Sequence, residues 1–227
     1  MPNVDFSSNG ATASGYLAVP SSGSGPTTIV LQEWWGLEDH IRSVCDRLAS
    51  EGFVALAPDL FHGETTTEPD EAKQLMMALD MDRAVAEMSG AVSYLCAHEA
   101  NTAGEKVGSV GFCLGGGLSV WAASVNPQIA AAVTYYYVMA HGKPDFAKIE
   151  APVLGHFGTA DDFVSVDDAK SLEQEMLSAG VDVQFEFYEG AGHAFFNDTN
   201  RLGTYDKDAA ERSWTRTMGF LREQLGD

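Results

Sequence analysis

The stretch Gly111-Phe112-Cys113-Leu114-Gly115-Gly116 constrains the fold of this chain more than any other segment. It follows the apolar run Val107 to Val110 and opens a helix-periodic segment from Gly116 onward. A strand that feeds a helix through Gly-x-Cys-x-Gly is typical of a nucleophile elbow, here with sulfur where serine is usual. Its turn needs small residues two positions either side of the nucleophile. No serine and neither other cysteine has glycine at both positions, so any elbow in this chain centres on Cys113.

Strand-like and helix-periodic segments alternate along the chain, which is typical of a parallel sheet covered on both faces. The sequence therefore predicts an α/β fold, with a mostly parallel central sheet, in one domain over residues 1–227. The predicted strands are 16–19 (an edge strand), 28–31, 53–57, 107–112, 129–136, 153–157 and 183–188. The predicted helices are 39–50, 70–79, 82–98, one from Gly116, one opened by a capping box at Ser165 and extending to about Ala179, and 206–225.

The composition excludes several classes of partner. A net charge of −20 disfavours nucleic acid and anionic membranes, which attract clusters of Lys and Arg. No apolar segment is long enough to cross a bilayer, and Met1 to Asp5 lacks a basic and apolar leader. Cys45 and Cys96 fall on apolar helix stripes and are interpreted as buried and reduced. We expect a cytoplasmic protein that is a monomer or a small homo-oligomer.

An elbow nucleophile needs an acid and a histidine base, in that order along the chain. Asp161 and Asp162 follow the strand that ends at Phe157, and His193 follows the strand that ends at Tyr188. Because the carboxyl ends of parallel strands meet at one edge of the sheet, we expect His193 to reach Cys113 there. Asp161 would orient the imidazole, with Asp162 as the alternative.

The segment Gln32-Glu33-Trp34-Trp35-Gly36 follows the buried strand 28–31 at the same edge. A carboxylate and two large aromatic rings in this position indicate the wall of a site. The amides of Trp34 and Leu114 are candidate donors for an oxyanion hole. Of the three tyrosines that end strand 129–136, Tyr135 and Tyr136 are the ones predicted to face the pocket, and at least one of the three is expected to pack in the core.

The remaining histidines are weaker candidates. His156 lies inside a strand and is interpreted as a satisfied core group, while His40 and His98 fall on helices, where solvent or capping roles are expected. No Cys/His pair has the spacing of a zinc site. We therefore expect neither a metal nor a cofactor.

Taken together, these motifs resemble the dienelactone hydrolase family of α/β-hydrolases. The resemblance covers about residues 16–225, and its specific parts are Gln32-Glu33 with Gly36, Pro58-Asp59-Leu60, Gly111 to Gly116, Gly158 with Asp161 to Val164, and Gly192-His193. It implies a hydrolase of carboxylic esters or lactones. It also implies Cys113 as nucleophile, His193 as base, Asp161 as acid, an oxyanion hole from Trp34 and Leu114, and Glu33 as a control on thiol ionisation.

The chain departs from the family where the two arginines that grip a substrate carboxylate would lie. Asn197 stands at one of these positions, and the other falls near Pro69. Met76 and Ala194 also replace pocket residues of the family. We therefore expect a neutral, hydrophobic ester or lactone, with a promiscuous activity on phosphotriesters as an extension. The predicted substrate contacts are Trp35, Tyr135, Tyr136, Met76 and Asn197.

Two other classes of function stay open from the sequence. The first is a catalytically quiet protein that binds a small ligand in the same pocket. The second is a thiol redox sensor that cycles Cys113 through a sulfenic acid, although an obvious resolving cysteine is missing.

Overall fold

The eight strands found within residues 3–226 belong to one sheet. The computed structural model describes residues 3–226. The order across the sheet is β1-β2-β4-β3-β5-β6-β7-β8; β1 and β2 pair antiparallel with their neighbours, and the strands from β4 to β8 run parallel. The predicted α/β fold is confirmed. The strands are β1 (Val4–Ser8), β2 (Ala11–Ala18), β3 (Thr27–Leu31), β4 (Val54–Pro58), β5 (Val107–Phe112), β6 (Ile129–Tyr135), β7 (Val153–Gly158) and β8 (Val183–Tyr188).

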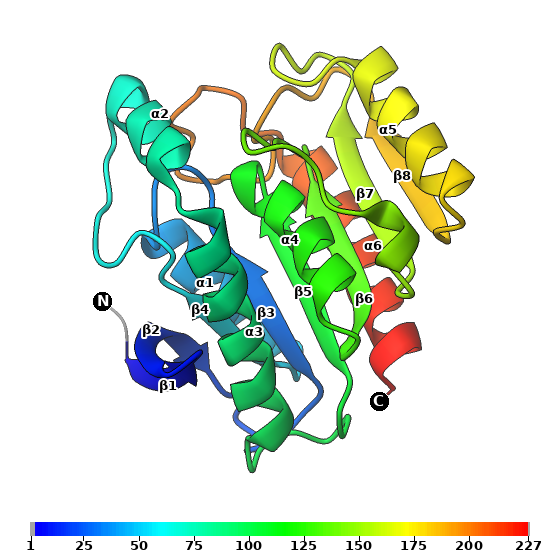
Figure 1. Cartoon of the computed structure of the whole chain (residues 1–227). Helices are drawn as coiled ribbons and strands as arrows, with labels where there is room; N and C mark the ends of the chain where they lie inside the picture. Colours follow the sequence, from blue (N-terminus) through cyan, green and yellow to red (C-terminus); the bar gives the residue numbers. More distant parts are fainter. Residues whose placement is uncertain (1–2, 227) are drawn as a thin grey trace.

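Helices cover both faces of this sheet (Figure 1). On one face, α1 (Asp39–Ser50) and α6 (Lys207–Leu225) bury residues such as Val44, Leu48 and Leu221 in one apolar cluster. On the other, α3 (Met81–Ala97), α4 (Leu114–Val125) and α5 (Val166–Ser178) bury Met88, Leu118 and others in a second. The 3₁₀ turn η1 (Phe146–Lys148) contacts α4 and α5. The short α2 (Pro69–Ala78) lies beside the loops at the carboxyl ends of the strands.

The amino-terminal edge differs from the prediction. The predicted edge strand is the end of β2, and the true edge strand is β1, which pairs with β2 in a hairpin. The turn consists of Asn9 and Gly10, both with positive φ (45° and 81°). Asn-Gly is the preferred pair for such a turn because both residues tolerate this conformation. The Asn-Gly pair was therefore the signal for the missed strand.

Helix starts follow local side-chain chemistry. The Ser165 hydroxyl accepts a hydrogen bond of 3.1 Å from the amide of Asp168, so the predicted cap of α5 is confirmed. The Asp206 carboxylate likewise accepts the amide of Ala209 over 3.0 Å at the start of α6. Helix α4 begins at Leu114, two residues earlier than predicted. The sharp elbow turn uses only Cys113, which leaves the next residue free to start the helix.

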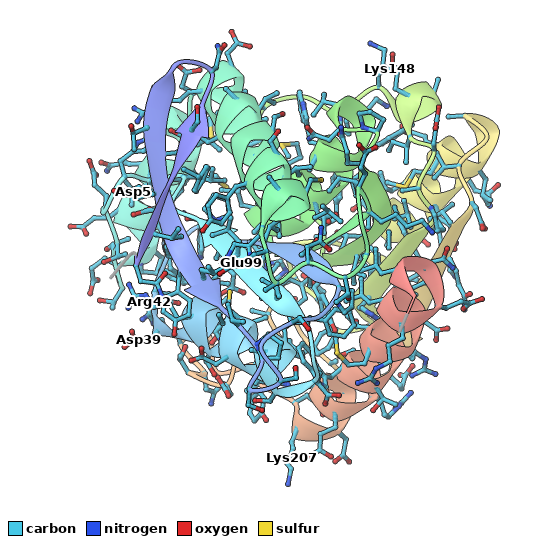
Figure 2. All side chains as sticks on the ribbon, turned by 90° about the horizontal axis from the view of Figure 1, so that it is seen from below. Asp5, Asp39, Arg42, Glu99, Lys148 and Lys207 are labelled. Carbon is cyan, nitrogen blue, oxygen red and sulfur yellow. The ribbon has the colours of Figure 1, made fainter. Side chains whose placement is uncertain are left out.

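Charged side chains are dispersed over the surface. In Figure 2, Asp5, Lys148 and Lys207 lie on different sides of the molecule, while Asp39 and Arg42 lie side by side on α1 and pair over 2.7 Å. Over the whole chain, acidic residues outnumber basic ones by 33 to 13. Within residues 3–226, no helix combines the length and the apolar character that a membrane crossing requires.

Candidate active site

Cys113 lies at a strained turn between β5 and α4. Its φ of 55° and ψ of −116° belong to a backbone region that residues other than glycine rarely adopt. A Cβ atom at Gly111 would lie 1.8 Å from the carbonyl oxygen of Gly115, and one at Gly115 would lie 2.1 Å from that of Leu31. Both glycines are therefore required by close backbone approach, as the elbow pattern predicts.

The elbow places the Cys113 thiol against the first turn of α4. The residue is buried, with 6% of its surface exposed. The positive end of a helix favours an anion at this point. Leu114 is the first residue of α4, so its amide has no acceptor within the helix. Among residues 3–226, neither this amide nor that of Trp34 donates to a backbone carbonyl. Both are free to bind an oxyanion.

His193 and Asp161 come together as the order of the motifs predicts. The Nδ1 and Oδ2 atoms are 2.9 Å apart, and the two side chains are 4% and 0% exposed. The other oxygen, Oδ1, accepts the amides of Phe163 and Val164 over 2.7 and 2.9 Å. These bonds fix the carboxylate in place. Asp162, the alternative acid, is exposed.

The charge of Cys113 acts directly on the His193 ring. Burial by itself lowers the pKa of His193, but the negative Cys113 and the hydrogen bond to Asp161 outweigh it and raise the pKa to about 10. Nε2 is buried and has no hydrogen-bond partner among the described residues. This nitrogen is available to exchange a proton with the thiol or with a substrate.

Replacing Cys113 by Ala is expected to lower the pKa of His193 from about 10, because the largest contribution that raises it is removed, while burial persists and Asp161 alone opposes it. Ring resonances of His193, followed by NMR from pH 5 to 11, measure this shift. An unchanged titration in the variant would show that the two side chains are not coupled.

Glu33 is held by neutral donors inside the site. Its carboxylate is 1% exposed and accepts the Asn197 side-chain amide over 2.5 Å and the Tyr136 hydroxyl over 3.3 Å. The Asn197 oxygen in turn accepts the amide of Thr199 over 3.0 Å. The polar atoms of Asn197 are thus engaged within the protein. The Asn197 side chain thus holds Glu33, and its contact with substrate stays a prediction.

Tyr135 and Tyr136, which were predicted to face the pocket, have rings 6.0 Å apart, but their hydroxyls bind different partners. Tyr136 has a positive φ of 38°, and its ring packs edge-on against His193 at 5.0 Å between centroids. Tyr135 is fully buried, with its hydroxyl 2.8 Å from Thr217 of α6. The Tyr135 hydroxyl thus points toward α6, whereas the Tyr136 hydroxyl points toward Glu33. The prediction of Tyr135 as a substrate contact is wrong.

Aromatic rings form the rim of the site. Phe163 is 58% exposed, and its ring lies 4.6 Å from the His193 ring and 6.2 Å from Trp34. Trp34 is half-buried and packs against Trp35 at 5.0 Å. Trp35 is only 2% exposed, so it lies inside this wall rather than on its surface. Sequence reasoning missed Phe163, although an apolar side chain two residues after the acid was a usable signal.

The other candidates stand apart from this hydrogen-bonded group. Met76 is half-buried on α2, where it packs against the second apolar cluster. His156 is a satisfied core group, as predicted, bonded to Thr217 and Tyr188. His40 was expected at the surface and is 2% exposed, with Nδ1 3.2 Å from Asp198. Long-range packing of the His193 loop on α1 buries it.

The two cysteines outside the elbow differ in burial. Cys45 is fully buried, and burial raises the pKa of its thiol. Cys96 is half-buried rather than buried, so the sequence overstated its burial. Within residues 3–226, no group of three or more His, Cys, Asp or Glu side chains is arranged to hold a metal ion.

Comparisons with known proteins agree on one family. The profile of the dienelactone hydrolase family matches residues 13–225. Protein usf of Aquifex pyrophilus is 38% identical, with 98% of each chain covered. A protein of Aquifex aeolicus, provisionally named carboxymethylenebutenolidase, is 34% identical with the same coverage. Among solved structures, a dienelactone hydrolase-like promiscuous phosphotriesterase from metagenomic libraries superposes with a TM-score of 0.86, at 26% identity over 98% of this chain and 97% of that chain.

Proposed function

Because this chain belongs to the dienelactone hydrolase family, we propose that it hydrolyses carboxylic esters or lactones through an acyl-thioester on Cys113. One observation carries the proposal. A strained cysteine at a helix start acts on the buried His193, whose other ring nitrogen meets Asp161 at 2.9 Å. Nucleophile, base and orienting acid in this arrangement serve covalent acyl transfer.

In the first half-reaction, His193 takes the thiol proton and Cys113 attacks the substrate carbonyl carbon. The C–O double bond opens, and the amides of Trp34 and Leu114 bind the resulting oxyanion. Collapse of this intermediate breaks the bond to the alcohol oxygen. The imidazolium donates its proton to that oxygen, and the acyl group stays on sulfur.

In the second half-reaction, neutral His193 takes a proton from water, and the hydroxide attacks the thioester carbon. The same two amides bind the second oxyanion. The C–S bond then breaks, the acid leaves, and the proton on His193 balances the charge of the thiolate. Asp161 keeps the ring in one tautomer throughout.

The natural substrate class follows from the charges around Glu33. Its hydrogen-bond partners are the neutral groups of Asn197 and Tyr136, and the rim is formed by Trp34 and Phe163. A substrate carboxylate would meet a buried carboxylate and no paired cation. We propose that neutral, hydrophobic esters or lactones are preferred.

This preference is measured with two esters of one acyl series, one neutral and one with a terminal carboxylate. We expect the neutral ester to have a kcat/KM at least ~10-fold higher, because one uncompensated desolvated charge costs more than 1.4 kcal/mol. Equal values would contradict the proposed substrate class and leave the thiol mechanism untouched.

Glu33 is proposed to control the ionisation of Cys113. Replacing Glu33 by Gln removes a buried negative charge beside the thiol and keeps the side-chain shape, at the cost of one of its two accepting oxygens, so the pKa of the thiol should fall. Titration of the thiolate absorbance near ~240 nm measures this change. An unchanged thiol pKa in the variant would show that Glu33 does not control the ionisation of Cys113.

A second activity is favoured by the similarity to the promiscuous phosphotriesterase. We propose that the same thiolate attacks phosphorus in a neutral phosphotriester, with the oxyanion hole receiving the phosphoryl oxygen. Paraoxon hydrolysis by the wild type and by Cys113→Ala tests this. Turnover that survives in the variant would assign the activity to another site.

A further inference from the structure

Three loops meet where the parallel strands end, near the top of Figure 1. Residues 32–38 follow β3 and carry Glu33 and Trp34; residues 59–68 follow β4; and residues 189–206 follow β8 and carry His193. The loop after β3 is joined to the loop after β8 by the bond from Asn197 to Glu33. The relative position of these loops therefore sets the distance between the oxyanion hole and the base.

Arg201 lies in the loop after β8, and its guanidinium group contacts both of the other loops. One nitrogen pairs with the Glu38 carboxylate, and another donates to the Thr66 carbonyl over 3.1 Å. The central carbon lies 5.4 Å from the centre of the Trp35 ring. The planar fork of arginine supplies all three contacts at once, which the point charge of lysine cannot do.

The loops after β3 and β4 also contact each other through their backbones. The amide of Thr66 donates to the carbonyl of Trp35 over 3.1 Å. Gly36 has a φ of 93°, and a Cβ atom there would lie 2.4 Å from the Glu64 carbonyl oxygen. The loops after β3 and β4 are thus in direct contact, and Arg201 closes the group from the side of the His193 loop.

The buried Glu38 carboxylate costs stability at neutral pH, and Arg201 offsets part of that cost. The Glu38 side chain is 8% exposed, and its Oε1 atom is buried with no partner among the described residues. Burial raises the pKa of Glu38 to about 7 even though Arg201 lowers it. The folded state holds this proton more tightly than the unfolded chain, so the free energy of unfolding falls as pH rises toward 7. Removing Arg201 alone would therefore leave the buried Glu38 charge uncompensated.

We propose that Arg201 is a positioning residue for hydrolysis, which holds the Trp34 amide in register with Cys113 and His193. The inference rests on the proposed function, because it assigns the amide of Trp34 to the oxyanion hole. Trp34 directly precedes Trp35, the ring that Arg201 covers. A shift of this segment by about 1 Å can cost on the order of 100-fold in rate.

The test compares two reactions of Cys113 in Arg201→Gln. Hydrolysis of p-nitrophenyl butyrate needs the oxyanion hole, whereas alkylation of the thiolate by iodoacetamide does not. We expect kcat for the ester to fall by about 10- to 100-fold, with KM changed less than threefold and the alkylation rate constant unchanged. Arg201→Lys should recover only part of the loss. If Cys113→Ser stays as active as wild type, the proposed function fails independently of this test.

The matched control is Arg222→Gln. Arg222 also pairs with a glutamate and a backbone carbonyl, both of Glu51, over 2.7 and 3.2 Å, but at the opposite end of the sheet. The activity of the Arg222→Gln variant should be unchanged. The double variant Arg201→Gln with Glu38→Gln removes the unpaired buried charge and should recover thermal stability without recovering kcat. Wild-type kcat in a folded Arg201→Gln, or equal losses in ester hydrolysis and alkylation, would overturn the proposal.

Discussion

Cys113→Ala is expected to lower kcat/KM for p-nitrophenyl butyrate by about 10³-fold or more, because no bond to the acyl carbon can form without the thiolate. Cys113→Ser should also lose at least ~10-fold, since a hydroxyl ionises far less readily than a thiol beside the same imidazole. The measurement is steady-state hydrolysis of the acetate, butyrate and octanoate esters, with all variants in parallel.

The matched control for this loss is Cys96→Ser. Cys96 is a half-buried thiol on α3, with a weak bond to the Glu105 carbonyl at 3.5 Å. It should keep wild-type activity. Hydrolysis that persists in Cys113→Ala would assign the chemistry to another group, while absence of hydrolysis in the wild type would favour the ligand-binding or redox alternatives.

Asp161→Asn is expected to lower kcat by about 10²- to 10⁴-fold. The amide would donate to Nδ1 of His193 and force the ring proton onto Nε2, the nitrogen that must accept the thiol proton. The loss of charge also weakens the imidazolium, because Asp161 contributes to the raised pKa of His193. The expected kinetic signature is a lower kcat at neutral pH with KM little changed.

Asp162→Asn provides the matched comparison. Asp162 is adjacent in sequence and exposed, so its substitution should change kcat less than twofold. If Asp162→Asn caused the larger loss, the assignment of the acid would be reversed. Wild-type kcat in both variants would show that catalysis by His193 needs no carboxylate.

Local sequence patterns predicted much of the fold and the placement of the elbow, of Asp161 and of His193. The elbow glycines, the buried strands and the positions of Asp161 and His193 after strand ends are local signals. The carboxyl ends of parallel strands meet at one edge, so local positions fix which side chains approach one another. The hydrogen bond between Asp161 and His193 follows from this geometry.

Features that depend on distant partners could not be predicted in the same way. Glu33 and Asn197 are separated by 164 positions, and only the folded loops reveal that one holds the other. The face of Tyr135 depends on where β6 ends and on the positive φ of the next residue. His40 is buried because Phe112 and Phe196 pack against its ring, again from remote segments.

The acyl-thioester is the central claim, and trapping it is the most direct test. Wild-type protein is mixed with p-nitrophenyl butyrate, quenched in acid within milliseconds, digested and examined by mass spectrometry. We predict one butyryl group on the peptide that contains Cys113, formed at the rate of the p-nitrophenol burst and absent from Cys113→Ala. Hydrolysis without this adduct, or a butyryl group on a different residue that turns over at the same rate, would contradict the account.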